Sequence, residues 1–282
     1  MNYEGFLVVN AFLHSDKFTE IYDWLKAASE RKGVSLDVYN NGEVIPDGYD
    51  FCLFWDKDIP LARSLERKGI RLFNPSEAIR ICDDKYATYE ALIDTGIAMP
   101  YTEAVPMTYE NIGYTNFDFI ENKMSSFAYP VVIKECHGSF GAQVYLADNR
   151  DEACEILKSI GGKPAIMQEY IKECKGTDIR INMVGKKAVC AMERYNDNDF
   201  RANITNGGSM RKHTVTDAEL ELSVKVMEAL GLDFAGVDIL LSDRGPMLCE
   251  VNSNAHFKNI FDCTGVNVAD HIMDYIIEEL GK

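Results

Sequence analysis

The chain has 282 residues, of which 46% are hydrophobic and 26% are charged, and its formal net charge at pH 7 is −16. This composition is that of a soluble globular protein of one to three domains, and no apolar run approaches the roughly 20 residues that span a bilayer. The acidic charge also argues against nucleic acid as a partner, because a phosphate backbone requires a basic surface. The eight cysteines include no Cys-x-x-Cys pair, and no basic secretory segment follows Met1, which together favour reduced thiols in the cytoplasm.

The first 73 residues are predicted to alternate strands with helices. Four buried strands are expected, at Gly5–Leu13, Val34–Tyr39, Asp50–Trp55 and Ile70–Phe73. Two helices, each with an apolar stripe, are expected between them, at Asp16–Lys32 and Ile59–Lys68. This alternation predicts a small α/β domain with a mainly parallel sheet. The turn at Asn10–Ser15 contains no glycine, so the fingerprint of a dinucleotide site is absent.

The remainder of the chain shows no internal repeat and no low-complexity linker. Helices are predicted to begin at Asn74-Pro75-Ser76 and near Asp84, and to occupy Glu152–Ile160, Asp217–Leu230 and Val268–Leu280. Strands are predicted at Tyr129–Glu135, Gln143–Ala147, Ala165–Ile171, Asp178–Val184 and Lys187–Tyr195, with a final pair inside Gly236–Asn252. The strands at Asp178–Val184 and Lys187–Tyr195 are joined by a turn at Gly185, and those of the final pair by a turn at Ser242–Gly245, which is typical of antiparallel strands.

The final strand pair carries three oxygen-bearing side chains, Asp238, Glu250 and Asn252. A three-residue hairpin loop centred on Arg244, with Gly245 at the position of positive φ, would place Asp238 directly opposite Glu250. Their Cβ atoms would then lie about 4.5–5.5 Å apart, and alternation would put Asn252 on the face of Glu250. The intervening apolar residues Val237, Ile239, Cys249 and Val251 would point into a core.

Two carboxylates held together between apolar strands are costly unless a cation lies between them. Oxygen ligands of this kind suit Mg²⁺ or Mn²⁺ that bridges substrate phosphates, and they do not suit zinc. The alternative is a pair of solvent-facing acids on an edge hairpin. The neighbouring Asp233 and Asp243 are expected to be turn residues only.

A second set of residues suits a nucleotide. Lys134 ends a strong strand, and the loop that follows it contains Gly138, Ser139 and Gly141, whose small size lets backbone N–H groups approach phosphate oxygens. A second strand follows this loop, and no Gly-Lys-Ser/Thr is present, so it is not a Walker loop. A glycine hairpin without a ligand is the alternative. Residues Gln168-Glu169-Tyr170-Ile171 offer an extended backbone edge that could pair with a purine amine.

In chain order these features resemble the ATP-grasp enzymes, and most closely the RimK-like α-L-glutamate ligases. The residues that carry the resemblance are Lys85, Lys134 with its glycine loop, Gln168–Ile171, Asp178-Ile179-Arg180, Arg201-Ala202-Asn203 with Gly207-Gly208, Asp238 and Glu250-Val251-Asn252. It extends from about Asn74 to the end of the chain. It implies an α/β (α+β overall) ATP-grasp fold with a pre-ATP-grasp α/β domain at residues 1–82 and an ATP-grasp domain at 83–282. Within the latter, a lid lobe is expected at about 99–168 and an antiparallel catalytic lobe at about 169–282.

The resemblance also implies roles for individual residues. The set expected to bind ATP is Lys85, Lys134, Gly138, Ser139, Gly141, Gln168, Glu169, Tyr170, Ile171 and Asp178, with Arg201 and Asn203 at the γ-phosphate and the acyl-phosphate. Magnesium or manganese would be held by Asp238, Glu250 and Asn252. Arg180 and Arg194 would meet substrate carboxylates, since a guanidinium forms a planar bidentate fork; a surface ion pair is the alternative. Asn254 and His256 would lie at the substrate, with His256 either a proton acceptor or a structural histidine.

The implied activity is ATP-dependent ligation of a carboxylate to an amine through an acyl-phosphate, on small-molecule or peptide substrates. Two features depart from the family pattern. Ser253–Lys258 stands where relatives have a small residue, proline and glycine, and Gln143 stands where a glycine is usual. The first departure lies at the expected substrate site and leaves the substrate open. The alternatives are a kinase on the same scaffold and a non-catalytic ATP-binding regulator; a homo-oligomer is also compatible with the sequence.

Overall fold

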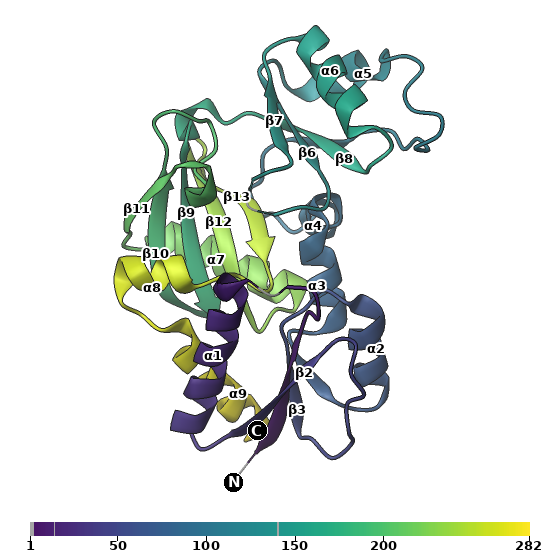
Figure 1. Cartoon of the computed structure of the whole chain (residues 1–282). Coiled ribbons are helices and arrows are strands. Elements are labelled where there is room, and N and C mark those ends of the chain that lie inside the picture. Colours follow the sequence, from purple (N-terminus) through teal and green to yellow (C-terminus); the bar gives the residue numbers. More distant parts are fainter. Residues whose placement is uncertain (1–2, 14, 140) are drawn as a thin grey trace.

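The computed structural model describes residues 3–13, 15–139 and 141–282, which form three sheets (Figure 1). The first sheet is parallel, with strand order β2-β1-β3-β4. Its strands are β1 (Glu4–Val9), β2 (Ser35–Asn40), β3 (Phe51–Phe54) and β4 (Arg71–Phe73), with helices α1 (Asp16–Arg31) and α2 (Ile59–Arg67) between them. The predicted first strand is too long, because the Asn10 side chain accepts a hydrogen bond from the Phe12 amide and turns the chain directly after β1.

The second sheet is antiparallel, has the order β5-β8-β6-β7 and forms the lobe drawn in teal in Figure 1. Helices α3 (Ser76–Asp83) and α4 (Lys85–Leu92) lead into it. Its elements are β5 (Thr102–Ala104), α5 (Phe119–Lys123), η1 (Met124–Ser126), β6 (Val131–Glu135), β7 (Val144–Ala147), α6 (Arg150–Ile160) and β8 (Ala165–Glu169). We call residues 102–169 the lid lobe. The sequence did not predict β5 or α5, which are both short.

The third sheet is antiparallel and has the order β11-β10-β9-β12-β13. Its strands are β9 (Thr177–Val184), β10 (Lys187–Tyr195), β11 (Ser209–Lys212), β12 (Phe234–Ser242) and β13 (Gly245–Asn252). The accompanying helices are η2 (Lys172–Cys174), η3 (Ile204–Asn206), α7 (Asp217–Leu230), α8 (Lys258–Thr264) and α9 (Val268–Leu280). The predicted bounds of α7 and α9 agree with the structure. The polar edge strand β11 and the short α8 were missed.

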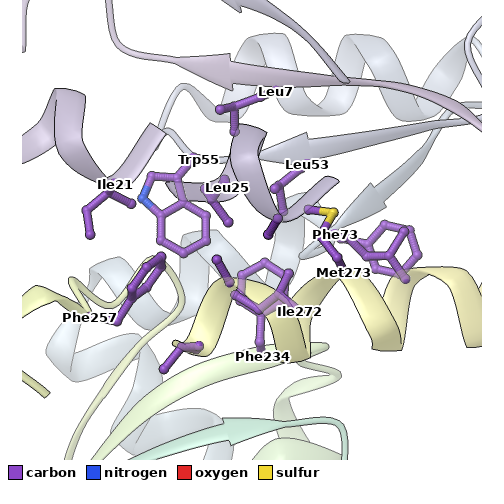
Figure 2. Packing of buried hydrophobic residues seen from close by; sticks show 14 of the residues in the cluster. Leu7, Ile21, Leu25, Leu53, Trp55, Phe73, Phe234, Phe257, Ile272 and Met273 are labelled. Carbon is purple, nitrogen blue, oxygen red and sulfur yellow. The ribbon is translucent and has the colours of Figure 1, made fainter. Parts of the chain in front are cut away.

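The first and third sheets share one hydrophobic core. Figure 2 shows Trp55, which directly follows β3 of the first sheet, against Phe234 and Phe257, and the Trp55 and Phe234 rings stack with centroids 5.6 Å apart. The lid lobe instead has its own core, whose buried members all lie between Val105 and Met167. The first and third sheets therefore form one body, and the lid lobe is attached to it without sharing its core. None of the helices in the described part of the chain combines the length and the apolar character of a membrane span.

Asn74 joins the two parts of the body. Its side chain is fully buried, and its amide nitrogen donates to the carbonyl oxygens of Phe234 and Ser253, at 2.9 and 3.0 Å. Its amide oxygen accepts from the backbone amides of Asp233 and Phe234, at 2.6 and 3.1 Å. One side chain thus satisfies four buried backbone groups at the start of β12 and just after β13, the two strands that carry the carboxylates.

Replacing Asn74 with alanine should leave these four backbone groups without partners and lower the free energy of unfolding by about 3 kcal/mol. Urea unfolding of the purified variant measures this. Asn122→Ala, at an exposed position of α5, is the matched control and should change little. Equal stability of the two variants would contradict the role given to Asn74.

Candidate functional site

A cleft of about 860 Å³ lies between the lid lobe and the third sheet. Most of the residues that the sequence singled out line this cleft. They are Lys85, Lys134, Gly138, Ser139, Gly141, Gln168, Glu169, Tyr170, Ile171, Asp178, Arg194, Arg201, Asn203, Asp238 and Glu250. Arg180, Asn252, Asn254 and His256 are not among its lining residues. The cleft therefore gathers side chains from both lobes at one place.

Lys134 is a buried cation on the lid-lobe side of the cleft. It lies in the middle of the second sheet, is 8% exposed, and donates from Nζ to Gln168 Oε1 at 2.7 Å. Gln168 in turn donates to Thr102 Oγ1 at 2.8 Å, which fixes its oxygen toward the lysine. No carboxylate of the described residues lies within 4.0 Å of the ammonium group. A buried ammonium that has only a neutral partner favours an anionic ligand over an empty glycine hairpin.

The glycine loop after Lys134 packs on the third sheet's side of the cleft. Gly141 has a φ of 72°, and a side chain there would meet Asn203 Oδ1. Arg201 donates from Nη1 to the carbonyl oxygens of Gly141 and Val144, at 2.9 and 3.3 Å, while Asp199 holds the rest of its guanidinium. The loop is thereby tied to the segment that contains Arg201 and Asn203. Phe140, in the same loop, lies outside the described residues.

The segment predicted to hold a purine runs along the edge where the lid lobe meets the body. The Glu169 carboxylate accepts hydrogen bonds from the Tyr101 amide at 3.2 Å and from Arg244 Nη2 at 2.7 Å. Glu169 therefore fastens β8 to the turn between β12 and β13. Within the described part of the chain, no hydrogen bond uses the Ile171 amide, so this backbone donor remains available to a ligand.

The predicted pairing of Asp238 with Glu250 is confirmed, but the predicted loop is wrong. Ser242 pairs with Gly245, whose φ is 96°, so the loop has two residues and would by itself shift the register by one. A β-bulge at Cys249 restores the alignment. As a result Leu248, and not Cys249, enters the core, while Cys249 lines the cleft. Burial raises the pKa of the Cys249 thiol to about 11.

Asp238 already has cationic partners in the protein. Arg180 makes a bidentate pair with it, with both N···O distances 2.6 Å, and Arg194 Nη2 lies 2.9 Å from Oδ2. Arg194 also makes a bidentate pair with Asp178, at 2.6 and 2.7 Å. Burial alone would raise the pKa of the Asp238 carboxyl, but the charges of Arg180 and Arg194 outweigh it and hold that pKa below its ordinary value.

The two arginines expected to meet substrate carboxylates are thus engaged with Asp238 and Asp178 in this structure. The surface ion pair considered for Arg194 is wrong, because its side chain is 6% exposed. Asp178, expected to bind ATP, accepts from Arg194 with both carboxylate oxygens. Any contact of these groups with substrate requires them to share or exchange partners.

The three predicted metal ligands differ in how far other residues of the protein already bind them. Glu250 is about one third exposed and faces Lys85 at 3.5 Å, and the Asn252 amide nitrogen is buried without a partner. The carboxylate of Glu250 therefore fits a divalent cation, whereas Asn252 could hold one only through its amide oxygen, because an N–H group is a donor and not a metal ligand. Asp238 fits only if the metal shares its oxygens with Arg180. Among the described residues, no group of three or more His, Cys, Asp or Glu is placed to hold a metal ion.

Asn254 and His256 do not line the cleft but contact the turn after β3 and helix α1. Asn254 Nδ2 donates to the Asp56 carbonyl oxygen at 3.0 Å, and His256 Nε2 lies 2.7 Å from the Lys17 carbonyl oxygen. A ring nitrogen that bonds a carbonyl must carry the hydrogen, so only Nδ1 of His256 remains as a proton acceptor. Burial lowers the pKa of His256, which keeps its ring neutral at pH 7.

Comparison with known proteins decides the family. Residues 82–276 match the family described as the RimK-like ATP-grasp domain. A protein of Enterobacter sp. (strain 638) named probable α-L-glutamate ligase is 36% identical over 217 residues, which cover 76% of this chain and 70% of that protein. The chain belongs to the RimK-like ATP-grasp family.

Two further matches extend the comparison of this RimK-like ATP-grasp protein, one in sequence and one in fold. β-Citrylglutamate synthase B of Danio rerio is 31% identical over 228 residues, which cover 80% of this chain and 55% of the synthase. The crystal structure of D-alanine–D-alanine ligase from Bacillus anthracis complexed with ATP superimposes with a TM-score of 0.76 at 17% identity, covering 99% of this chain and 97% of the ligase. The second match concerns the fold alone and confirms the predicted ATP-grasp fold.

Several residues of this ATP-grasp cleft were missed by the sequence analysis. Arg244 binds the cleft residue Glu169, and Asp199 binds the cleft residue Arg201. The residues next to them in the sequence do not indicate these contacts. Cys174 and Cys249 line the cleft, although both are ordinary apolar positions in the sequence. The length of the hairpin could have indicated the position of Cys249. A two-residue loop at Asp243-Arg244 leaves one more residue on the second strand than on the first, so a bulge is required if Asp238 is to face Glu250.

Lys134→Met should weaken ATP binding by roughly tenfold to a hundredfold, because it removes the only buried ammonium that lacks a carboxylate partner among the described residues that line the cleft. Titration calorimetry with Mg-ATP measures the dissociation constant. The control is Lys163→Met, a lysine that is 64% exposed and paired with Glu135 outside the cleft. ATP binding of the same strength in both variants would contradict the assignment.

Proposed function

We propose that this RimK-like ATP-grasp ligase activates a substrate carboxylate with ATP and joins it to the amine of an amino acid. ATP-dependent carboxylate–amine ligation is supported by the family and by relatives that are named as ligases. The observation that carries the proposal is the pair of cations Lys85 and Lys134, which line one cleft with the carboxylates Asp238 and Glu250. Cations suit the phosphates of a nucleotide, and oxygen ligands suit the metal that accompanies it.

In the proposed reaction the carboxylate oxygen attacks the γ-phosphate, and an acyl-phosphate and ADP are formed. The amine then attacks the acyl carbon, and phosphate leaves. Lys85 and Lys134 would hold phosphate oxygens, and Arg201 and Asn203 would bind the γ-phosphate side, which their closeness to the glycine loop supports. A phosphoryl transfer of this kind requires positioning and charge stabilisation more than covalent help from the protein.

Magnesium or manganese would be held by the Glu250 carboxylate and the amide oxygen of Asn252, and by Asp238 in competition with the guanidinium of Arg180. The metal, when bound, would neutralise charge on the phosphates. Within the protein itself, Arg180 comes nearest to supplying the positive charge that the metal would supply, because it already compensates the negative charge of Asp238. A guanidinium released from Asp238 would be available to a substrate carboxylate, which reconciles the predicted role of Arg180 with its present partner.

The amino acid that we propose as substrate resembles glutamate, and the other substrate is a peptide or a small molecule. The support is that relatives at about one third identity are named glutamate ligases. The loop Ser253–Lys258, which departs from the family pattern noted in the sequence analysis, is bonded through Asn254 to the turn after β3 and through His256 to helix α1. We therefore place the specificity of the chain at this junction between the third and first sheets.

The proposed function is tested by incubating the protein with Mg-ATP, L-glutamate and a panel of carboxylate acceptors. The release of ADP and of phosphate is measured, and the masses of the products are determined by mass spectrometry. A product heavier by one amino acid minus water, with one phosphate released, is the expected result. A phosphorylated product without free phosphate would identify a kinase, and saturable ATP binding without turnover would identify a regulator.

Glu250→Gln should reduce ADP release by about a hundredfold or more, because the amide cannot supply the negative charge that a divalent cation requires. The steady-state rate is measured over a range of magnesium concentrations. Asp243→Asn lies on the same hairpin at an exposed turn position and should behave like the unmodified protein. Wild-type rates for Glu250→Gln at every magnesium concentration would refute the metal assignment.

A further inference from the structure

Asp199 holds one edge of the Arg201 guanidinium, the edge formed by Nε and Nη2. Its Oδ1 accepts from Nε at 3.0 Å, and its Oδ2 accepts from Nη2 at 2.7 Å. The Asp199 and Arg201 side chains are 24% and 26% exposed. Their hydrogen bonds lower the pKa of the Asp199 carboxyl, which therefore stays charged at neutral pH. A bidentate pair of this kind fixes the plane of the guanidinium as well as its position.

The backbone of Asp199 is itself fixed to the body of the protein. Gly176, in the turn that leads into β9, donates its amide to the Phe200 carbonyl oxygen at 2.9 Å and accepts from the Asn196 amide at 2.8 Å. Gly176 has a φ of 67°, and a side chain there would collide with the carbonyl oxygens of Asn196 and Asp199. The segment that carries Asp199 is therefore attached to the third sheet through close backbone packing.

The second edge of the Arg201 guanidinium, formed by Nη1 and Nη2, reaches the lid lobe. Nη1 donates to the carbonyl oxygens of Gly141 and Val144, at 2.9 and 3.3 Å. A guanidinium has five N–H donors, and Asp199 and these two carbonyl oxygens use four of them. The fifth, on Nη2, has no acceptor within the described parts of the chain. Because Arg201 lines the cleft, this second edge is available to an oxyanion that binds there.

Phe200, between Asp199 and Arg201 in the sequence, packs on one face of the guanidinium. Its ring centroid lies 5.5 Å from Arg201 Cζ, and the ring stands edge-to-face with that of Tyr170, with centroids 6.4 Å apart. An ion pair between two mobile surface side chains would orient a guanidinium poorly. Arg201 is instead held on one edge by Asp199 and on one face by Phe200, which leaves the second edge as the part that can bind a ligand.

We propose that Asp199 is a positioning residue, which holds Arg201 so that the second edge of its guanidinium faces the γ-phosphate. The phosphate would take the free Nη2 donor and share Nη1 with the glycine loop. A guanidinium that is already ordered binds without the cost of ordering it. Asp199 is not among the residues that line the cleft, so its effect passes through Arg201. This inference rests on the proposed function, which places Arg201 at the γ-phosphate.

The test compares Mg-ATP with Mg-ADP, which lacks the γ-phosphate, by titration calorimetry without the other substrates. The unmodified protein should bind Mg-ATP more tightly. Asp199→Asn keeps the shape of the side chain but removes its charge, and it should weaken Mg-ATP binding about tenfold while Mg-ADP binding changes less than about twofold. Asp197→Asn, at an exposed position of the same loop, is the matched control and should bind both nucleotides like the unmodified protein.

A double-mutant cycle tests whether the effect passes through Arg201. Arg201→Met should remove the preference for Mg-ATP, and adding Asp199→Asn to it should then have no further effect. A residue that merely stabilises the fold would weaken binding in both backgrounds. Asp199→Glu retains the carboxylate and should keep more of the preference than Asp199→Asn.

The inference would be overturned by an unchanged preference in Asp199→Asn, by an equal loss of affinity for both nucleotides, or by additive effects in the double variant. Melting temperatures exclude unfolding as the cause, and Asp199→Ser takes the place of Asp199→Asn if the latter does not fold. A preference that Arg201→Met abolishes and Asp199→Asn preserves would reject the role of Asp199 alone and leave the proposed function standing. A protein without any preference for Mg-ATP, or one whose preference survives Arg201→Met, would reject both this inference and the proposed role of Arg201.

Discussion

The cleft depends on a buried cluster of four charges that spans three strands. Strand register places Arg180 of β9 opposite Asp238 of β12, and Asp178 of β9 opposite Arg194 of β10. Arg194 then bridges the two pairs through Asp238. Burying any one of these groups alone would be strongly unfavourable, so the cluster is stable only when all four are present and paired. It fixes the floor of the cleft, and any metal or substrate that binds there exchanges partners with it.

The second constraint is that the lid lobe has a core of its own. Its connections across the cleft are polar and few, such as Arg201 with the Gly141 carbonyl oxygen, Lys85 with the Gly138 carbonyl oxygen, and Arg244 with Glu169. A lobe that is held by exchangeable hydrogen bonds can move as a unit, whereas the first and third sheets cannot separate without exposing the core around Trp55 and Phe234. The nucleotide side of the cleft is therefore adjustable, and the junction at Asp56 and Asn254 belongs to the rigid body.

Sequence reasoning identified the elements with strong periodicity and the residues whose spacing has a chemical meaning. It placed α7 and α9 correctly and put Asp238 opposite Glu250, although through the wrong loop, because alternation cannot reveal a bulge at an apolar residue such as Cys249. It could not find the partners of Arg180 and Arg194, since these depend on which strands become neighbours. Asn74 escaped notice for the same reason: its importance comes from contacts with residues more than 150 positions away.

The most direct test of the account follows the oxygen atoms of the activated carboxylate. If that carboxylate is labelled with ¹⁸O and the complete reaction is run with Mg-ATP and the amine, an acyl-phosphate passes one labelled oxygen to phosphate. The account predicts that the phosphate released contains one ¹⁸O atom per turnover, detected by mass spectrometry. Phosphate without label, accompanied by an amide product, would show that the carboxylate is not activated by phosphorylation and would contradict the account.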